Sequence, residues 1–259
     1  MLASRPAELW RYRDLLTNLV LRDLRVKYKG STLGFAWSLL HPLLMAAVYT
    51  LAFRYVLQVR VPHFPVFLLA GLLPWTFLAA SLASAGGAVV DNGVLVRKVA
   101  FPRAVLPLGA VASQFVQFVL MYVVIIPLAA TLGTGLSAAL FALVPLALLQ
   151  LAFTAGLSLA VSAAQVHFRD TQHLVGVILQ VWFWLTPIVY PITLVPEAFR
   201  GWLRLNPMAL FAVAYQDAVL QHTMPSAADT AILTAVAALA LVLGLALFRR
   251  QEGRFAELV

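Results

Sequence analysis

The stretch VKYKGSTLGFAWSLLHPLLM, residues 26–45, changes from a basic run to an uncharged one within a few residues. Lys27 and Lys29 lie before Gly30, and no formally charged side chain follows in the rest of the stretch. A basic segment beside a long apolar one is typical of the place where a chain enters a membrane. The stretch therefore predicts an interfacial segment, a turn at Gly30 and Ser31, and then a spanning helix.

The composition of the whole chain predicts an integral membrane protein. Of its 259 residues, 63% are hydrophobic and only 11% are charged, whereas about 25% are charged in an average soluble domain. So short a chain cannot bury this much apolar surface in water, and a bilayer accommodates it. The chain has no cysteine, which excludes disulfides, thiol catalysis and thiolate metal sites.

Six apolar segments are long enough to cross a bilayer, since about 20 apolar residues are needed. The predicted spans are about 33–56, 66–90, 104–130, 137–166, 171–191 and 229–248. Most of the 18 Lys and Arg residues lie in segments that would share one side of the membrane with the N-terminus. The positive-inside rule then predicts cytoplasmic N- and C-termini. It also accounts for the net charge of +8 without a nucleic-acid partner.

The expected fold class is therefore an all-α integral membrane protein. Residues 1–32 form a cytoplasmic N-terminus, and residues 33–259 form a single six-span domain. Within the first part, residues 8–29 predict an amphipathic helix, because apolar residues such as Leu16 and Leu19 recur at helical spacing opposite a basic and polar face. This helix is too polar to span and is expected at the inner membrane surface.

The segment between the fifth and sixth predicted spans is apolar but too short to cross. It contains PMALFAVAYQDAVL, residues 207–220, and Asn206-Pro207 interrupts it. We expect two short helices, about 197–204 and 208–221, that enter the outer leaflet as a re-entrant pair. Such a pair requires covering protein or a cavity nearby, because bare irregular backbone is not tolerated in lipid.

The sequence gives no sign of catalytic or metal chemistry. A phosphate-binding loop of the G-x-x-x-x-G-K-[ST] type is missing, so this chain is not expected to hydrolyse a nucleotide. His167 and His173 lack a third ligand nearby in the sequence. The predicted spans hold almost no acidic residues, which argues against transport coupled to ions.

Aromatic and histidine residues in the spans allow two interpretations. Trp182 and Trp184 fall in the middle of a predicted span, where interfacial anchoring aromatics are not expected. They are either lipid contacts or flat faces on which sugar rings stack. His41 precedes Pro42, so it marks either a helix kink or the inner half of a transport path.

The inner loop between the second and third predicted spans also allows two interpretations. Asp91 and Asn92 are good helix-start residues, and Arg97 and Lys98 follow within two turns. The loop is either a capped turn that carries orientation charges or a docking helix for a cytoplasmic protein.

Two segments resemble the membrane subunits of type-2 ABC exporters. They are YKGSTLGFAWSLLHPLL, residues 28–44, and DNGVLVRKVAFPRAVLPL, residues 91–108. The resemblance covers the whole chain and is greatest to exporters of polysaccharide and polyol phosphate, which carry lipid-linked O-antigen, capsule or teichoic acid. It implies a homodimeric permease in the bacterial inner membrane, surrounded by membrane lipids. It also implies two separate ATP-binding cassette subunits that hold ATP and Mg²⁺, with no cofactor on this chain.

The resemblance also implies roles for individual residues. The substrate path is expected to include Trp37, His41, Tyr49, Trp182 and Trp184. The entrance for an anionic lipid headgroup is expected at Arg22, Arg25, Lys27 and Lys29. ATPase coupling is expected at Asn92, Leu95, Arg97, Lys98 and Phe101, and an outer gate at Glu197, Trp202, Asn206 and Tyr215.

Three other functions stay open at this point. A type-2 permease for drugs or small lipids shares the same topology. A self-sufficient channel or secondary carrier would work without an ATPase. A membrane enzyme acting on lipid-linked sugars would need converging carboxylates or histidines at one membrane face, and the sequence does not predict such a cluster.

Overall fold

The chain is built from helices that run between two ends of one bundle. The computed structural model describes residues 11–31, 34, 36–56, 58 and 61–259. The longer helices are α2 (Arg13–Tyr28), α3 (Ala36–Thr50), α4 (Phe64–Asp91), α6 (Val105–Thr131), α7 (Leu143–His167), α8 (Thr171–Trp184), α10 (Pro207–Gln216) and α11 (Ala227–Gln251). The shorter ones are η1 (Leu51–Val56), α5 (Gly93–Lys98), η2 (Ala138–Ala142), η3 (Ile192–Leu194), α9 (Glu197–Leu203), η4 (Asp217–Gln221), η5 (Glu252–Arg254) and α12 (Phe255–Leu258).

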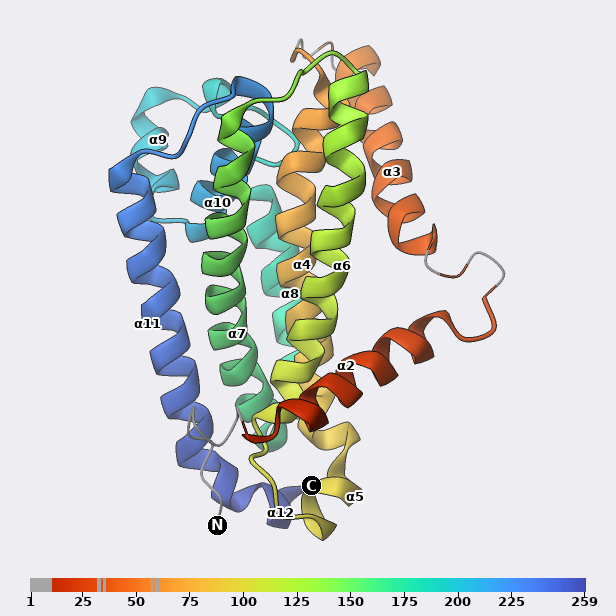
Figure 1. The fold of residues 1–259 in the computed structure, drawn as a ribbon. Helices are drawn as coiled ribbons and strands as arrows, with labels where there is room; N and C mark the ends of the chain where they lie inside the picture. Colours follow the sequence, from red (N-terminus) through yellow and green to blue (C-terminus); the bar gives the residue numbers. More distant parts are fainter. Residues whose placement is uncertain (1–10, 32–33, 35, 57, 59–60) are drawn as a thin grey trace.

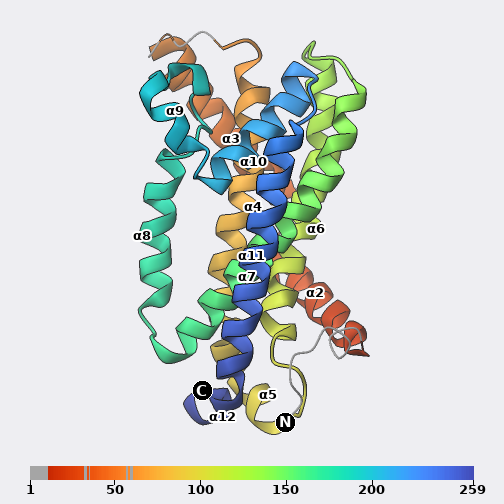
Figure 2. The same ribbon diagram turned by 90° about the vertical axis from the view of Figure 1, so that its left-hand side faces the viewer.

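The two ends of the bundle carry different short helices. Figure 1 shows α5 and α12 at the lower end, and α9 and α10 in the upper half. Figure 2 shows the same division from the side, with α8 rising from the lower end and stopping beneath α9. Helix α4 contacts α3, α6, α7, α8 and α10 and is therefore the central helix of the fold.

Five helical segments of the described chain are long and apolar enough to cross a membrane. They are Leu39–Val56, Phe64–Asp91, Val105–Thr131, Ala138–His167 and Ala227–Leu258. The start of the first predicted span, at residue 33, lies outside the described residues. The other predicted boundaries agree to within a few residues, except in the fifth span and at the end of the sixth, where the helical segment runs on from 248 to Leu258.

The fifth predicted span, 171–191, is wrong in its length. Helix α8 ends at Trp184, and 14 residues of α-helix measure about 21 Å. The hydrocarbon core of a bilayer is about 30 Å thick. The chain leaves the helix at Leu185, two residues before Pro187, because proline disfavours helical backbone before it.

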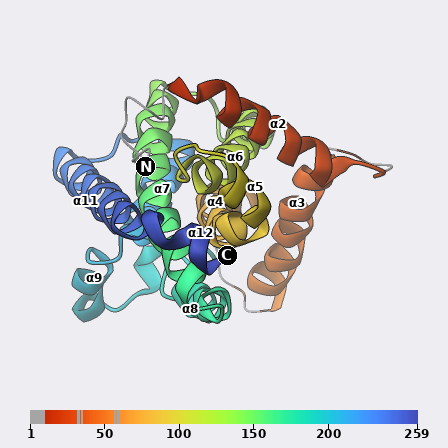
Figure 3. The ribbon, with the colours of Figure 1, turned by 90° about the horizontal axis from the view of Figure 1, so that it is seen from below.

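The predicted amphipathic helix is present as α2. Its residues 8–10 lie outside the described part of the chain. Leu19 is buried against α6, where Gly109 leaves room for the leucine Cβ. Most of the basic residues of α2 stay exposed on its other faces. The helix crosses the lower half of α6 in Figure 1, and Figure 3 shows it beside α6 from below.

A proline in α4 connects three helices. Pro74 has no N–H, so it cannot donate to the carbonyl oxygen of Ala70. The hydroxyl of Tyr122 on α6 donates to that oxygen at 3.0 Å. The side-chain amide of Gln150 on α7 donates to the carbonyl oxygen of Pro74 at 2.6 Å. The carbonyl oxygen of Ala70 therefore stays hydrogen-bonded, and the two side-chain bonds connect α4 to α6 and to α7.

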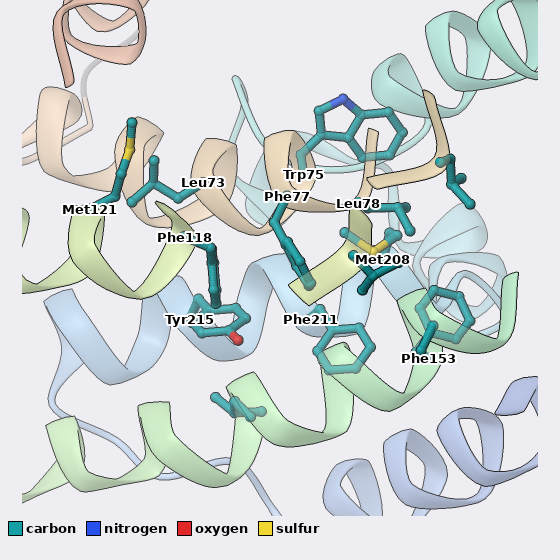
Figure 4. Packing of buried hydrophobic residues seen from close by; sticks show 14 of the residues in the cluster. Leu73, Trp75, Phe77, Leu78, Phe118, Met121, Phe153, Met208, Phe211 and Tyr215 are labelled. Atoms are coloured by element: carbon teal, nitrogen blue, oxygen red, sulfur yellow. The ribbon is translucent and has the colours of Figure 1, made fainter. Parts of the chain in front are cut away.

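An aromatic cluster fills the core beside this proline. Phe118 lies between Phe77 and Tyr122, with ring centroids 5.0 and 5.1 Å away. Tyr215 of α10 stacks on Tyr122 at 5.4 Å. Figure 4 shows Phe77, Phe118 and Tyr215 side by side between the helices. The cluster packs α10 against α4 and α6, which holds the upper short helices in place.

Helices α7 and α11 come into backbone contact where they cross. A Cβ placed on Gly156 would collide with the backbone of Ala240, and one placed on Gly244 would collide with the backbone of Gly156. Small residues at such a crossing let two spanning helices pack closely in lipid. The two glycines therefore set the distance between α7 and α11.

We predict that Gly156→Ala destabilises the folded protein by about 1–3 kcal/mol, because the added methyl group pushes two backbones apart. The measurement is thermal unfolding in mild detergent. Gly176→Ala on α8 is the matched control, since a Cβ there meets nothing within 4 Å and alanine favours helix over glycine. Equal unfolding temperatures for Gly156→Ala and wild type would contradict the assigned role of Gly156.

Candidate functional site

Three adjoining hollows follow one side of α4 from the lower end to the upper half. The lower hollow, of about 530 Å³, lies between α2, α4 and α6. The middle hollow, of about 380 Å³, lies between α2, α3, α4 and α6. The upper hollow, of about 450 Å³, lies between α3, α4 and α8. The lower and middle hollows share Lys27, Gln114 and Gln117.

Helix α3 separates the middle hollow from the upper one. His41, Pro42 and Thr76 line both. Residues that line two hollows at once mark the place where the hollows meet. The predicted path residue His41 therefore lies at the junction of the two.

The middle hollow has polar groups where it meets the lower hollow and where it meets the upper one, with apolar groups between them. Its lining includes Lys27, Trp37, His41, Thr76, Gln114, Gln117, Phe77, Phe118 and Met121. The predicted residues Trp37, His41 and Lys27 are brought together here. Thr76 was missed by the sequence reasoning, because the second predicted span reads as uniformly apolar around it.

Lys27 points from α2 into this lining. Its Nζ donates to Oε1 of Gln117 at 2.7 Å. The Gln117 amide in turn donates to the Ser113 carbonyl oxygen and to Oε1 of Gln114, each at 3.2 Å. Partial burial lowers the pKa of Lys27 from its ordinary value, because desolvation disfavours the charged ammonium. An anion bound in the hollow would favour the charged ammonium and so act against this lowering of the pKa.

The other predicted entrance residues lie apart from the middle hollow. Arg22 pairs with Asp23 at 3.0 Å and lines the lower hollow. Arg25 and Lys29 line a fourth hollow of about 620 Å³ along α2, which Arg22 lines as well. Arg22 therefore lies where this hollow meets the lower one.

The upper hollow is lined largely by aromatic side chains. Tyr49, Trp75, Phe183 and Trp184 line it together with Gln180. The ring centroid of Phe183 lies 6.5 Å from that of Tyr49 and 5.7 Å from that of Trp75. Flat rings at the wall of a hollow can stack on the C–H faces of sugars, and the amide of Gln180 can bond to hydroxyl groups.

The predicted position of Trp182 and Trp184 in mid-span is wrong, because α8 ends at Trp184. Trp184 is exposed beside the upper hollow. Trp182 is turned away from it, and its indole N–H donates to Oδ1 of Asn206 at 2.7 Å. Trp182 therefore connects α8 to the α9–α10 turn and is not part of the lining of the described hollows.

The α5 region combines exposed and buried positions. Arg97 and Lys98 are exposed and Leu95 is half-buried. Asn92 accepts a hydrogen bond from Arg22 at 3.3 Å and donates to the Ala88 carbonyl oxygen. The prediction that Phe101 contacts a partner is corrected, because this side chain is buried in the core.

The predicted outer-gate residues occupy different environments. Glu197 and Trp202 are exposed on α9, and Glu197 pairs with Arg200 at 3.7 Å. The Asn206 side chain is hydrogen-bonded to Trp182 and Leu185 at the end of α8. Tyr215 is fully buried in the aromatic cluster, and its role at an outer gate stays a prediction. An apolar sequence such as that of α10 is found both in helices buried in protein and in helices that contact lipid.

Comparison with known proteins identifies the family. The ABC-2 type transporter family matches residues 15–220, which is more than half of the chain. The chain belongs to the ABC-2 type transporter family. The match runs from α2 to η4 and includes all three hollows.

Relatives of this ABC-2 type transporter chain align over nearly its whole length. The O-antigen export system permease protein RfbA of Myxococcus xanthus is 37% identical, over 96% of this chain and 97% of the relative. A protein of the same name from Klebsiella pneumoniae is 33% identical, over 95% of each chain. The polysialic acid transport protein KpsM of Escherichia coli is 24% identical, over 90% of this chain and 92% of the relative.

We predict that Asn206→Ala destabilises this ABC-2 type transporter chain by about 1–3 kcal/mol, since it removes an N-cap and several bonds to the end of α8. Asn206 Oδ1 accepts from Met208 N, and Nδ2 donates to the Leu185 carbonyl oxygen. Thermal unfolding measures the loss, and Glu197→Ala at an exposed position is the control. Tryptophan emission should shift to longer wavelength, and should not shift in a Trp182→Phe background. An unchanged unfolding temperature would contradict this role of Asn206.

Proposed function

We propose that this chain is the membrane-spanning subunit of an ATP-driven exporter that moves lipid-linked polysaccharide out of the bacterial cytoplasm. The observation that carries the proposal is the alignment with O-antigen export permeases over at least 95% of both chains. A match of that extent includes the α2 segment and the upper helix pair, which a generic membrane helix bundle would not share.

The three hollows support a route for the substrate along α4. The lower and middle hollows offer cationic and amide groups, which suit an anionic lipid anchor. The upper hollow offers Tyr49, Trp75 and Trp184, which suit sugar rings. A polar start and an aromatic continuation fit a molecule with a charged anchor and an uncharged polymer.

A second copy of the chain is expected to complete the pore. Helix α8 contains no buried residue, although it is apolar, and α3 also exposes large apolar side chains such as Trp37 and Leu44. Both helices border the upper hollow. Two copies that meet through α3 and α8 would enclose their two upper hollows, one from each copy, in a single path. The other faces of the spanning helices would then contact lipid.

The lower end of the bundle is expected to face the cytoplasm. Exposed Arg97 and Lys98 on α5 and the Arg249-Arg250 pair at the end of α11 are located there, as the positive-inside rule requires. In this orientation α5 docks on a separate ATP-binding subunit, which holds ATP and Mg²⁺. The short α8 and the α9–α10 pair together span the membrane as a sixth, re-entrant unit.

The test of this function is purification of the tagged chain in mild detergent from its native membrane, followed by mass spectrometry and an ATPase assay. The proposal requires a stoichiometric ATP-binding subunit in the eluate. It also requires ATP-dependent movement of lipid-linked polysaccharide into vesicles that contain the complex. Export of drugs or small lipids alone would favour the first alternative function, and transport without any ATPase would favour a self-sufficient carrier.

We predict that the double variant Tyr49→Ala and Trp184→Ala lowers polysaccharide export at least ten-fold, because it removes two rings from the upper hollow. Export is measured as polymer delivered to the cell surface in cells that lack the native chain. Tyr55→Ala is the matched control, since Tyr55 is also exposed on the α3–η1 segment but is not among the residues that line the hollows. Unchanged export in the double variant, with normal ATPase assembly, would remove these residues from the path.

A further inference from the structure

The last residues of the chain pack against α5. A Cβ placed on Gly93, the first residue of α5, would lie 2.5 Å from Cγ1 of Val259. A larger residue at this position would have to displace that side chain. Figure 3 shows α12 and the C-terminal residue beside α5 when the lower end of the bundle faces the viewer.

The segment 252–259, which we call the C-terminal segment, is fixed at several points. Phe255 is fully buried, and its ring centroid lies 5.1 Å from that of Phe248 and 6.4 Å from that of His167. The guanidinium of Arg103 donates to the carbonyl oxygen of Glu252. The segment is thereby attached to α11, to the end of α7 and to the loop that follows α5.

The stability of helix α5 depends on the segments packed against it. It has six residues, and an isolated helix of that length is not stable in water. Its buried side consists of Gly93 and Val96, and Gly93 faces the C-terminal segment. The orientation in which α5 shows Arg97 and Lys98 is therefore set in part by residues more than 150 positions later in the chain.

The exposed sides of α5 and of the C-terminal segment have the same character. Apolar groups are exposed at Val94, Val99 and Leu258. Cations are exposed at Arg97, Lys98 and Arg254, and one carboxylate is exposed at Glu257. Apolar side chains beside an excess of cations match a partner surface with an apolar cleft and a mainly acidic rim. The surface lies at the lower end of the bundle, below α4, where a cytoplasmic protein has access.

We propose that α5 and the C-terminal segment form one docking surface for the ATP-binding subunit, with Arg254 and Leu258 in direct contact with it. The proposal rests on the proposed function, because the partner is the subunit that supplies ATP hydrolysis. It assigns to the end of the chain a share of the binding that would otherwise belong to α5 alone.

The test uses Arg254→Glu and Leu258→Asp in the full-length chain, because both side chains are exposed and their replacement leaves the core intact. The probe is the ATP-binding subunit that co-purifies with the wild-type chain. Affinity is measured by titration of that subunit onto the permease in lipid nanodiscs. Arg204→Glu and Leu194→Asp are the matched controls, since both are exposed in the connections on either side of α9.

We expect each of the two C-terminal variants to weaken binding at least ten-fold with an unchanged unfolding temperature, and the controls to bind as wild type does. Binding within two-fold of wild type in both C-terminal variants would overturn the shared surface and leave the proposed function standing. An equal loss in the controls would also overturn it, as a general effect of charge. A changed affinity for anionic vesicles with unchanged partner binding would assign the segment to the lipid surface instead. The absence of any ATP-binding subunit with the wild-type chain would overturn the proposed function itself.

Discussion

The structure depends on how α4 satisfies its backbone in a solvent that offers no hydrogen bonds. An unpaired carbonyl in lipid costs several kcal/mol, and Pro74 creates such a carbonyl at Ala70. The Tyr122 hydroxyl donates to it, and the Gln150 amide donates to the carbonyl oxygen of Pro74. These two bonds fix α6 and α7 on the two sides of α4. The open side that remains is the side on which the hollows lie.

The same requirement shapes the upper half of the molecule. Helix α8 stops early, so the chain above it consists of irregular backbone and short helices. Asn206 bonds with Trp182, Leu185 and Thr186, and Gln216 donates to the Pro187 carbonyl oxygen at 3.0 Å. Gly71 allows that close approach of Gln216. Polar side chains from α10 and its turn thus supply the bonds that a longer α8 would have made for itself.

Much of the fold could be predicted from the sequence because long apolar runs admit few structures in a membrane. The helical class, the position of α2, four of the long spans and the short pair around Asn206-Pro207 all follow from such patterns. The length of α8 did not, because Leu185 to Tyr190 are as apolar as the helix before them. Hydropathy does not distinguish burial in lipid from burial in protein, so it could not predict that Tyr215 lies inside the aromatic cluster.

The candidate site was predictable only in part. His41, Tyr49 and Trp184 were selected by residue type, and the structure places them along the hollows. Thr76 lies where two hollows meet, yet nothing in its sequence neighbourhood distinguishes it. Trp182 and Phe101 have the expected residue types but point into protein. Which side chain of a helix faces a hollow depends on how that helix is rotated, and the packing of its neighbours decides that rotation.

The contact between Gly156 and Gly244 has a mechanical consequence. At this crossing the two backbones touch with no side chain between them to deform, so α7 and α11 form a stiff frame. In contrast, only 11% of the first spanning segment is buried within the chain, and α8 has no residue buried there. A displacement of α3 or α8 therefore disturbs few groups packed within one chain, and the frame keeps its shape while these two walls of the upper hollow move.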